Sequence, residues 1–254
     1  MSRARSRLAD PQALVAIGLI LVAAYGLRHA VTLGALLVFV VIVPSIILHE
    51  ISHGVVALAF GDDTARRAGR LSLNPLRHVD PIGTLVLPAL LALGGLGAFG
   101  YAKPVPVDPR RMRHPRNAAV LVGLAGPATN LLLAGLSVLA LRLTTPSSTL
   151  RALPAVLGQV GVTGLGPVVG TGVQVLVLIG FLNVTLAVFN ALPIPPLDGS
   201  AVLERLLPTS ALPTWWRVRR YAMVVLLVVV LWDPHGFLGQ VFAPAERAWI
   251  RLVA

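Results

Sequence analysis

The sequence predicts an all-α polytopic membrane protein with about five to six transmembrane helices. Of the 254 residues, 56% are hydrophobic and only 12% are charged, and the mean hydropathy is +0.83. Apolar runs of about 20 residues, the length that crosses a bilayer as a helix, recur along the chain. Most lysines and arginines lie in the short connections between these runs. No polar segment is long enough to bury a second core, so we expect one integral-membrane domain over residues 1–254.

The apolar runs define where the expected spans lie. The first follows a basic start and lacks a convincing small-x-small cleavage site, so we expect an uncleaved span with the N-terminus in the cytoplasm rather than a signal peptide. Residues 144–172, rich in Gly, Ser, Thr and Pro, are expected to form an exterior loop. Residues 236–252 fit either an amphipathic surface helix or a weak sixth span. The expected spans cover about residues 11–27, 31–60, 117–143, 173–192 and 215–232.

Residues 82–100 are apolar enough to span, but Pro88 and several glycines interrupt them. Five basic residues follow between positions 103 and 116, and a full crossing by 82–100 would leave them outside the cell, against the positive-inside tendency. We therefore expect a re-entrant or β-hairpin-like segment, which turns back without crossing. Under this topology sixteen of the 21 lysines and arginines lie on the cytoplasmic side.

The formal charge of +11 would suggest nucleic acid in a soluble protein. Here the basic residues flank apolar spans, where they orient helices and meet anionic lipid headgroups. We therefore expect membrane lipids and no nucleic acid as partners. The chain has no cysteine, which excludes disulfides, thiolate metal ligands and a cysteine nucleophile.

A metallohydrolase motif lies inside the second expected span, at His49-Glu50-Ile51-Ser52-His53. In a helix the two histidines stand one turn apart on the same face, so both imidazoles can bind one metal ion while Glu50 reaches its bound water. A soluble surface helix can carry this spacing for solubility alone. Within an apolar span that explanation fails, because ionisable groups at membrane depth cost free energy unless they are partnered.

A catalytic zinc ion needs a third protein ligand and one open position. The remaining histidines (His29, His78, His114 and His235) lie in loops or near termini, and we expect each to be solvated. Asp198 qualifies, because prolines stop the preceding helix and Gly199 permits a tight turn back toward the interior. Its alternative role is to cap a following helix over 201–207. The topology favours the ligand role, since it brings Asp198 to the same side of the membrane as His49 and His53.

The two motifs together resemble the site-2 protease family of intramembrane zinc metalloproteases, in its compact bacterial form without a PDZ domain. The second motif is Asn190-Ala191-Leu192-Pro193-Ile194-Pro195-Pro196-Leu197-Asp198-Gly199, similar to the family pattern NxxPxxxLDG. The resemblance implies one Zn²⁺ per chain, bound by His49, His53 and Asp198, with Glu50 as general base. It also implies that Asn190 is a polar group at the substrate or oxyanion, although a helix–helix hydrogen bond is its simpler role.

The family resemblance implies regulated intramembrane proteolysis at the cell membrane. The expected reaction is hydrolysis of peptide bonds in transmembrane-helix substrates near the cytoplasmic side. Two other classes remain open: a metal-binding transporter or channel, and an inactive scaffold that keeps its metal. The sequence identifies neither the substrate nor the oligomeric state.

Overall fold

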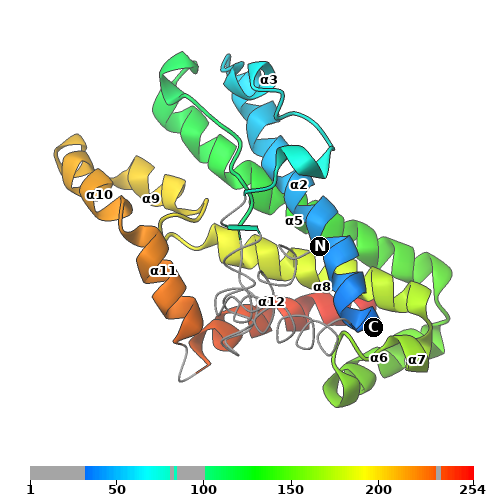
Figure 1. Ribbon diagram of the computed structural model, residues 1–254. Helices are drawn as coiled ribbons and strands as arrows, with labels where there is room; N and C mark the ends of the chain where they lie inside the picture. The colour runs from blue at the N-terminus through cyan, green and yellow to red at the C-terminus, as the bar shows by residue number, and fades with distance from the viewer. Residues whose placement is uncertain (1–31, 81–82, 85–100, 233–235) are drawn as a thin grey trace, which may run out of the picture.

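The computed structural model describes residues 32–80, 83–84, 101–232 and 236–254. Within these ranges every regular element is a helix and there is no strand (Figure 1). The predicted all-α class is therefore confirmed. The span expected at 11–27 lies outside the described residues, as does all of the re-entrant segment expected at 82–100 except positions 83 and 84.

Three long apolar helices form the centre of the fold: α2 (Leu33–Ala59), α5 (Pro115–Thr144) and α8 (Thr171–Ala191). Each is long and apolar enough to cross a membrane, and each coincides with an expected span. Helix α5 packs along both of the others (Figure 1). Small side chains allow close approach of helices in lipid, and two glycines of α5 serve this purpose: Gly126 faces α2, and Gly123 faces the chain beyond α8. At Gly123, for example, an added Cβ would lie 2.9 Å from the carbonyl oxygen of Asp198.

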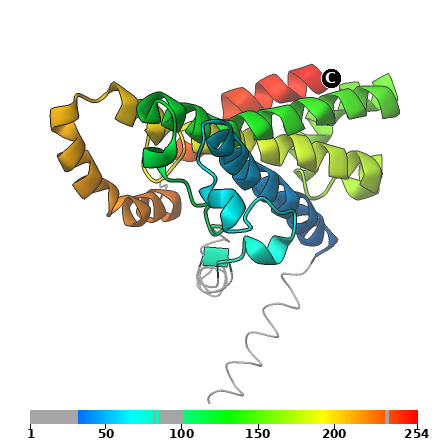
Figure 2. The same cartoon turned by 90° about the horizontal axis from the view of Figure 1, so that it is seen from above.

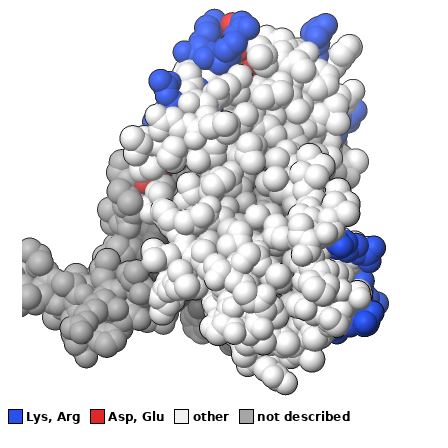
Figure 3. Space-filling model, turned by 90° about the vertical axis from the view of Figure 1, so that its right-hand side faces the viewer, with Lys and Arg blue, Asp and Glu red and all other residues white. Residues whose placement is uncertain are grey.

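The surface of the molecule matches a lipid environment. Figure 3 shows the described lysines and arginines gathered at separate places, with a broad uncharged surface between them. Large apolar side chains are exposed along the spans, as expected where lipid takes the place of water. On α2 and α5 they include Leu33, Leu36, Phe39, Val40, Leu121, Leu131, Leu132, Leu136, Leu139 and Leu143.

The segment expected as an exterior loop contains two helices, α6 (Ser147–Val160) and α7 (Gly166–Val169). Apolar residues of this segment join the core cluster formed by α5 and α8: Leu153 of α6 and Leu165, directly before α7, are almost fully buried. Burial of these leucines offsets the low helix propensity of a segment rich in glycine and proline.

The span expected at 215–232 forms two helices, α10 (Leu212–Arg219) and α11 (Ala222–Leu231), to one side of the bundle (Figures 1 and 2). Helix α9 (Ser200–Leu206) holds α10 through Glu204, which accepts hydrogen bonds from the indoles of Trp215 and Trp216 and pairs with Arg219 at 3.0 Å. All of these polar contacts lie before Ala222, where the apolar helix begins. With 10 residues, α11 is about 15 Å long, half of a hydrocarbon core.

Helix α12 (Phe237–Val253) forms where a surface helix or a sixth span was expected. It packs against α8 and α5, and its Trp249 is buried against Gly180, where an added Cβ would overlap the indole ring. The indole nitrogen of Trp249 donates to the carbonyl of Ala134 at 3.2 Å. Whether α12 crosses the membrane stays a prediction, as does the total number of spans.

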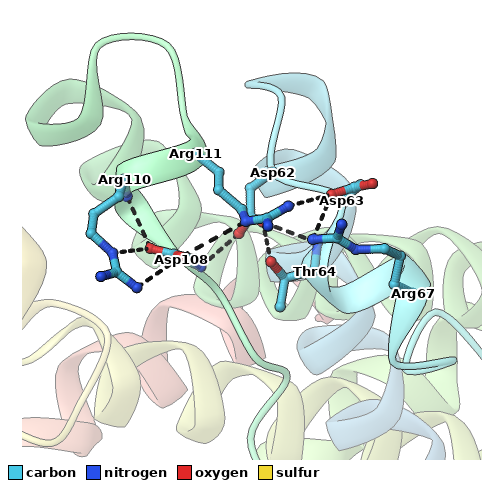
Figure 4. Close-up of polar contacts among 7 residues, drawn as sticks. All are labelled: Asp62, Asp63, Thr64, Arg67, Asp108, Arg110 and Arg111. Atoms are coloured by element: carbon cyan, nitrogen blue, oxygen red, sulfur yellow. Dashed lines mark hydrogen bonds and ion pairs between the residues drawn. The ribbon is translucent and has the colours of Figure 1, made fainter.

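The chain between α2 and α5 contains three short helical elements in its described parts. They are α3 (Thr64–Arg67), η1 (Pro75–Arg77) and η3 (Pro109–Arg111). Asp62 is fully buried and accepts hydrogen bonds from the amide of Thr64 (3.0 Å), the hydroxyl of Thr64 (2.5 Å) and the amide of Asp108 (2.6 Å) (Figure 4). Asp63 instead makes exposed ion pairs with Arg67 and Arg111. Asp62 therefore joins the end of α2 to residue 108.

The pKa of Asp62 reflects these contacts. Burial of the carboxyl group would raise its pKa, but the hydrogen bonds from Thr64 and Asp108 outweigh burial and hold the pKa below its usual value. The carboxylate therefore contributes stability in full above about pH 3.9, the usual value for an unfolded chain, and this contribution is lost as the pH falls through the lower pKa of the folded state.

We expect Asp62→Asn to lower the free energy of unfolding at pH 7 by about 1–3 kcal/mol, because an amide nitrogen would face the backbone N–H of Asp108. Thermal unfolding in detergent measures the loss. The gap between wild type and variant should narrow below about pH 4, since protonation weakens the same contacts in the wild type. Asp63→Asn is the matched control, because exposed ion pairs contribute about 0–1 kcal/mol. Equal destabilisation by both variants would contradict the assignment.

Candidate metal centre

Helix α2 presents His49 and His53 on its buried face. Both are almost fully buried, and their rings meet edge to face with centroids 4.7 Å apart. Each Nδ1 has a partner on α5: that of His49 lies 2.6 Å from Oδ1 of Asn130, and that of His53 lies 2.6 Å from the carbonyl oxygen of Val122. The Nε2 atoms are thereby left to point at a common third group.

That third group is Asp198, from the chain that follows α8. The amide of Gly199 donates to the carbonyl of Asn190 at 2.7 Å, so the chain folds back on the end of α8. A side chain at position 199 could not fit, because its Cβ would lie 2.1 Å from the carbonyl oxygen of Ala191. Oδ2 of Asp198 lies 3.0 Å from Nε2 of His49 and 3.4 Å from Nε2 of His53. Asp198 was alternatively expected to cap the following helix. In the described structure the N-cap of α9 is Gly199, and no side chain caps this helix.

The three ligand atoms fit a metal cation. They lie within 4.8 Å of one another. The carbonyl of Val122 can only accept, so Nδ1 of His53 carries the proton and its Nε2 presents a lone pair. Oδ2 of Asp198 is buried and receives no hydrogen bond from any described residue. Tetrahedral zinc with bonds of about 2.0–2.1 Å separates its ligand atoms by about 3.3 Å, close to both observed distances.

Gly126 on α5 makes room for the imidazoles. An added Cβ there would lie 2.4 Å from Cε1 of His49 and 2.6 Å from Nε2 of His53. Any larger residue would therefore displace the ring atoms that face Asp198. The glycine is as much a part of this centre as the ligand side chains.

Glu50 lies beside the cluster at the wall of a groove of about 720 Å³, which His53, Val105 and Asp198 also line. One carboxylate oxygen, Oε2, accepts a hydrogen bond from the amide of Val105 at 2.9 Å. This hydrogen bond fixes the direction of the carboxylate and does not engage its other oxygen, Oε1. The half-buried Glu50 is therefore oriented toward a space that a substrate can enter.

The extended segment that carries Val105 is held at both ends. The guanidinium of Arg70 donates to the carbonyls of Lys103 and Pro104, and the amide of Asp108 donates to Asp62. Proline at 104 and 106 excludes helix here, and residues 101–108 form no regular element.

Other candidate residues lie apart from the cluster. The side chain of Asn190 donates to the carbonyl of Leu186 in its own helix at 3.0 Å. His114 is exposed, as expected, but the expectation of a solvated His78 is wrong: the side chain is buried and its Nε2 lies 2.8 Å from the carbonyl oxygen of Ser72. Residue type alone does not reveal whether a loop histidine is packed in this way. His29 and His235 lie outside the described residues.

Sequence reasoning missed two residues of the centre, Asn130 and Asn183. Both are fully buried, and Asn130 contacts His49 directly. The available signal was an amide side chain within an apolar span, which is costly unless it has a partner.

Comparison with known proteins agrees with this chemistry. Residues 36–232 match the model of peptidase family M50. The chain is 38% identical over 192 residues to the "Putative zinc metalloprotease YwhC" of Bacillus subtilis (strain 168), covering 75% of this chain and 78% of that protein. It is 35% and 37% identical over 188 residues to proteins named "Putative zinc metalloprotease Rip2" from Mycolicibacterium smegmatis and Mycobacterium tuberculosis (strain H37Rv), covering 74% of this chain and 63% of each relative.

No solved structure matches the chain. The family model nevertheless covers most of the sequence, including both motifs and nearly all of the three membrane-length helices in the described part of the chain. The chain belongs to peptidase family M50, the site-2 proteases, and is a zinc metalloprotease of the membrane.

Proposed function

We propose that His49, His53 and Asp198 bind the zinc ion and that Glu50 is the general base in hydrolysis of transmembrane-helix substrates. The observation that carries this proposal is the convergence of three potential ligand atoms within 4.8 Å of one another, beside an oriented carboxylate. A zinc ion at this position supplies a Lewis acid that polarises the scissile carbonyl and lowers the pKa of bound water toward neutrality.

Glu50 accepts a proton from the attacking water and later delivers it to the leaving amine. The amide of Val105 holds one of its oxygens, so the carboxylate keeps a constant direction through both transfers. The groove beside Glu50 supports entry of an unwound peptide, because an intact helix hides its carbonyls in internal hydrogen bonds.

The cleavage site lies near the cytoplasmic boundary in this proposal. His53 is six residues before the end of α2 at Ala59, about 9 Å along the helix axis. The arginines of α3 and η3 follow at that end, which supports a cytoplasmic location for it and, with one span before α2, for the N-terminus as well. The partners are a transmembrane protein substrate and the surrounding lipids.

Asn190 keeps its proposed role at the substrate or oxyanion. It stands in the last turn of α8, directly before the chain that carries Asp198. Its amide uses one N–H on the carbonyl of Leu186, and an amide has a second N–H and an acceptor oxygen with which to contact a substrate.

Glu50→Gln should retain zinc and lose cleavage by about 10²–10⁴-fold, because the amide keeps the shape of the side chain but cannot take the proton. Purified protein in liposomes with a tagged single-span substrate measures cleavage, and elemental analysis measures zinc. Quantitative membrane proteomics of cells that express each form then identifies natural substrates. Unchanged cleavage by a zinc-loaded variant would refute the base role, and no cleavage by either form would favour the scaffold.

The double variant His49→Ala, His53→Ala should fall from about one zinc ion per chain to none, because one carboxylate cannot hold the metal alone. Elemental analysis of detergent-purified protein measures the ratio. His114→Ala, which removes an exposed histidine, is the control. Undiminished zinc in the double variant would locate the metal elsewhere.

Gly126→Ala should weaken zinc binding, because the added methyl group overlaps both imidazoles. Gly135→Ala is the matched control on the same helix, since no atom lies within 4 Å of a Cβ added there. Chelator competition compares the two affinities. Equal affinities would show that the histidines do not face α5 in the working enzyme.

A further inference from the structure

Four polar side chains form a continuous chain of hydrogen bonds through the core, from α2 across α8 and α5 to the metal centre. The hydroxyl of Ser45 donates to the carbonyl of Val41 at 2.9 Å. Asn183 donates to the oxygen of Ser45 at 2.9 Å and to the carbonyl of Ile179 at 2.8 Å. Asn130 then donates to Oδ1 of Asn183 at 2.6 Å, and Oδ1 of Asn130 lies 2.6 Å from Nδ1 of His49.

The direction of this chain is determined by the backbone carbonyls at its far end. A carbonyl oxygen can only accept, so the Ser45 hydroxyl must donate to Val41 and the Asn183 nitrogen must face Ile179. Both hydrogens of the Asn183 amide are then used, and its oxygen is directed at Asn130. Reversing the Asn183 amide would put two acceptors against each other at 2.8 Å in a buried site, which costs more than a lost hydrogen bond.

The orientation of Asn183 in turn determines the orientation of Asn130 and the protonated nitrogen of His49. Because the nitrogen of Asn130 is held by Asn183, its oxygen faces His49 and can only accept from Nδ1. His49 is thereby kept with its proton on Nδ1 and its lone pair on Nε2, the atom that lies 3.0 Å from Asp198. We infer that Asn130 and Asn183 are positioning residues that set the tautomer and ring orientation of His49 for zinc binding.

The Nδ1 atoms of the two histidines are held by different kinds of acceptor. Nδ1 of His53 reaches a backbone carbonyl of α5, whose acceptor character cannot change. Nδ1 of His49 reaches an amide side chain, which can present either a donor or an acceptor. Asn130 alone therefore does not determine the tautomer, and Asn183 is needed to orient it. The near-complete burial of Ser45, Asn130 and Asn183 supports this role, since water is not available to take their place.

The simpler role for these residues is to hold helices together. Hydrogen bonds between membrane helices contribute only about 0.6 kcal/mol on average, so such a role predicts a loss of stability with no specific effect on the metal. A positioning role predicts a loss of zinc affinity, because outer partners of metal ligands typically change affinity by about 10–100-fold. The inference rests on the proposed ligand role of His49.

The test compares Asn130→Leu, Asn183→Leu and Asn130→Asp with the wild type. Gln174→Leu is the matched control: Gln174 is also a buried amide on α8, but it bonds the carbonyls of Val162 and Thr163, away from the centre. Chelator competition on detergent-purified full-length protein measures zinc affinity. Absorption of the Co²⁺-substituted protein reports ligand geometry, and thermal unfolding of the metal-free protein measures stability.

We expect Asn130→Leu to weaken zinc binding by about 10–100-fold and to alter the Co²⁺ spectrum. Asn183→Leu should also weaken zinc binding, but by a smaller factor. Without Asn183 the Asn130 amide can rotate, and it then presents its oxygen to Nδ1 of His49 only part of the time. Asn130→Asp should bind zinc more tightly than Asn130→Leu, since a carboxylate oxygen still accepts from Nδ1. If Asn130→Leu does not fold, Asn183→Leu and Asn130→Asp provide the same comparison.

The inference is overturned if the Asn130 and Asn183 variants lose stability as Gln174→Leu does while their zinc affinity and Co²⁺ spectra match those of Gln174→Leu. His49→Ala separates this failure from failure of the proposed function. Zinc lost in His49→Ala but kept in both leucine variants refutes only the positioning role. Zinc kept in His49→Ala refutes the ligand assignment itself.

Discussion

The contact between Nε2 of His49 and Oδ2 of Asp198 depends on nearly every other feature of the described structure. It joins α2 to the chain beyond α8, two segments that α5 brings together by packing on both. Gly123 and Gly126, three residues apart on one face of α5, make the approach possible: the first leaves room for the backbone of Asp198 and the second for the imidazoles. A membrane bundle without close contacts on α5 could not bring these three ligand atoms together.

A second set of contacts builds the wall of the groove from outside the bundle. The segment around Val105 has no regular structure, and Arg70 and the buried carboxylate of Asp62 hold it at either end. Its amide then orients Glu50. The polar connection beyond α2 is thereby linked to the chemistry through Val105. Irregular backbone near the membrane is tolerated here because side chains satisfy its polar groups.

Much of this organisation could be predicted from local pattern. The three long apolar runs became α2, α5 and α8, because the need to satisfy backbone groups within lipid leaves a helix as the available solution. The division of residues 212–231 into α10 and α11 could not be predicted in this way. The polar contacts of α10 come from a different helix, where Glu204 binds two tryptophans and an arginine. The helices within 144–172 were likewise hidden, because their stability comes from leucines buried against α5 and α8.

The sequence by itself determined the helical class and the pairing of His49 with His53, because a four-residue interval places side chains on one helix face in any context. It also marked Asp198 as the carboxylate that a chain reversal could return to the same depth. Only the tertiary structure decided that Asn130 and Asn183 stand behind His49, that Asp62 is a buried acceptor while Asp63 is a surface ion pair, and that Val105 faces Glu50. These contacts join residues far apart in the chain, and no local period specifies which of several polar side chains will meet.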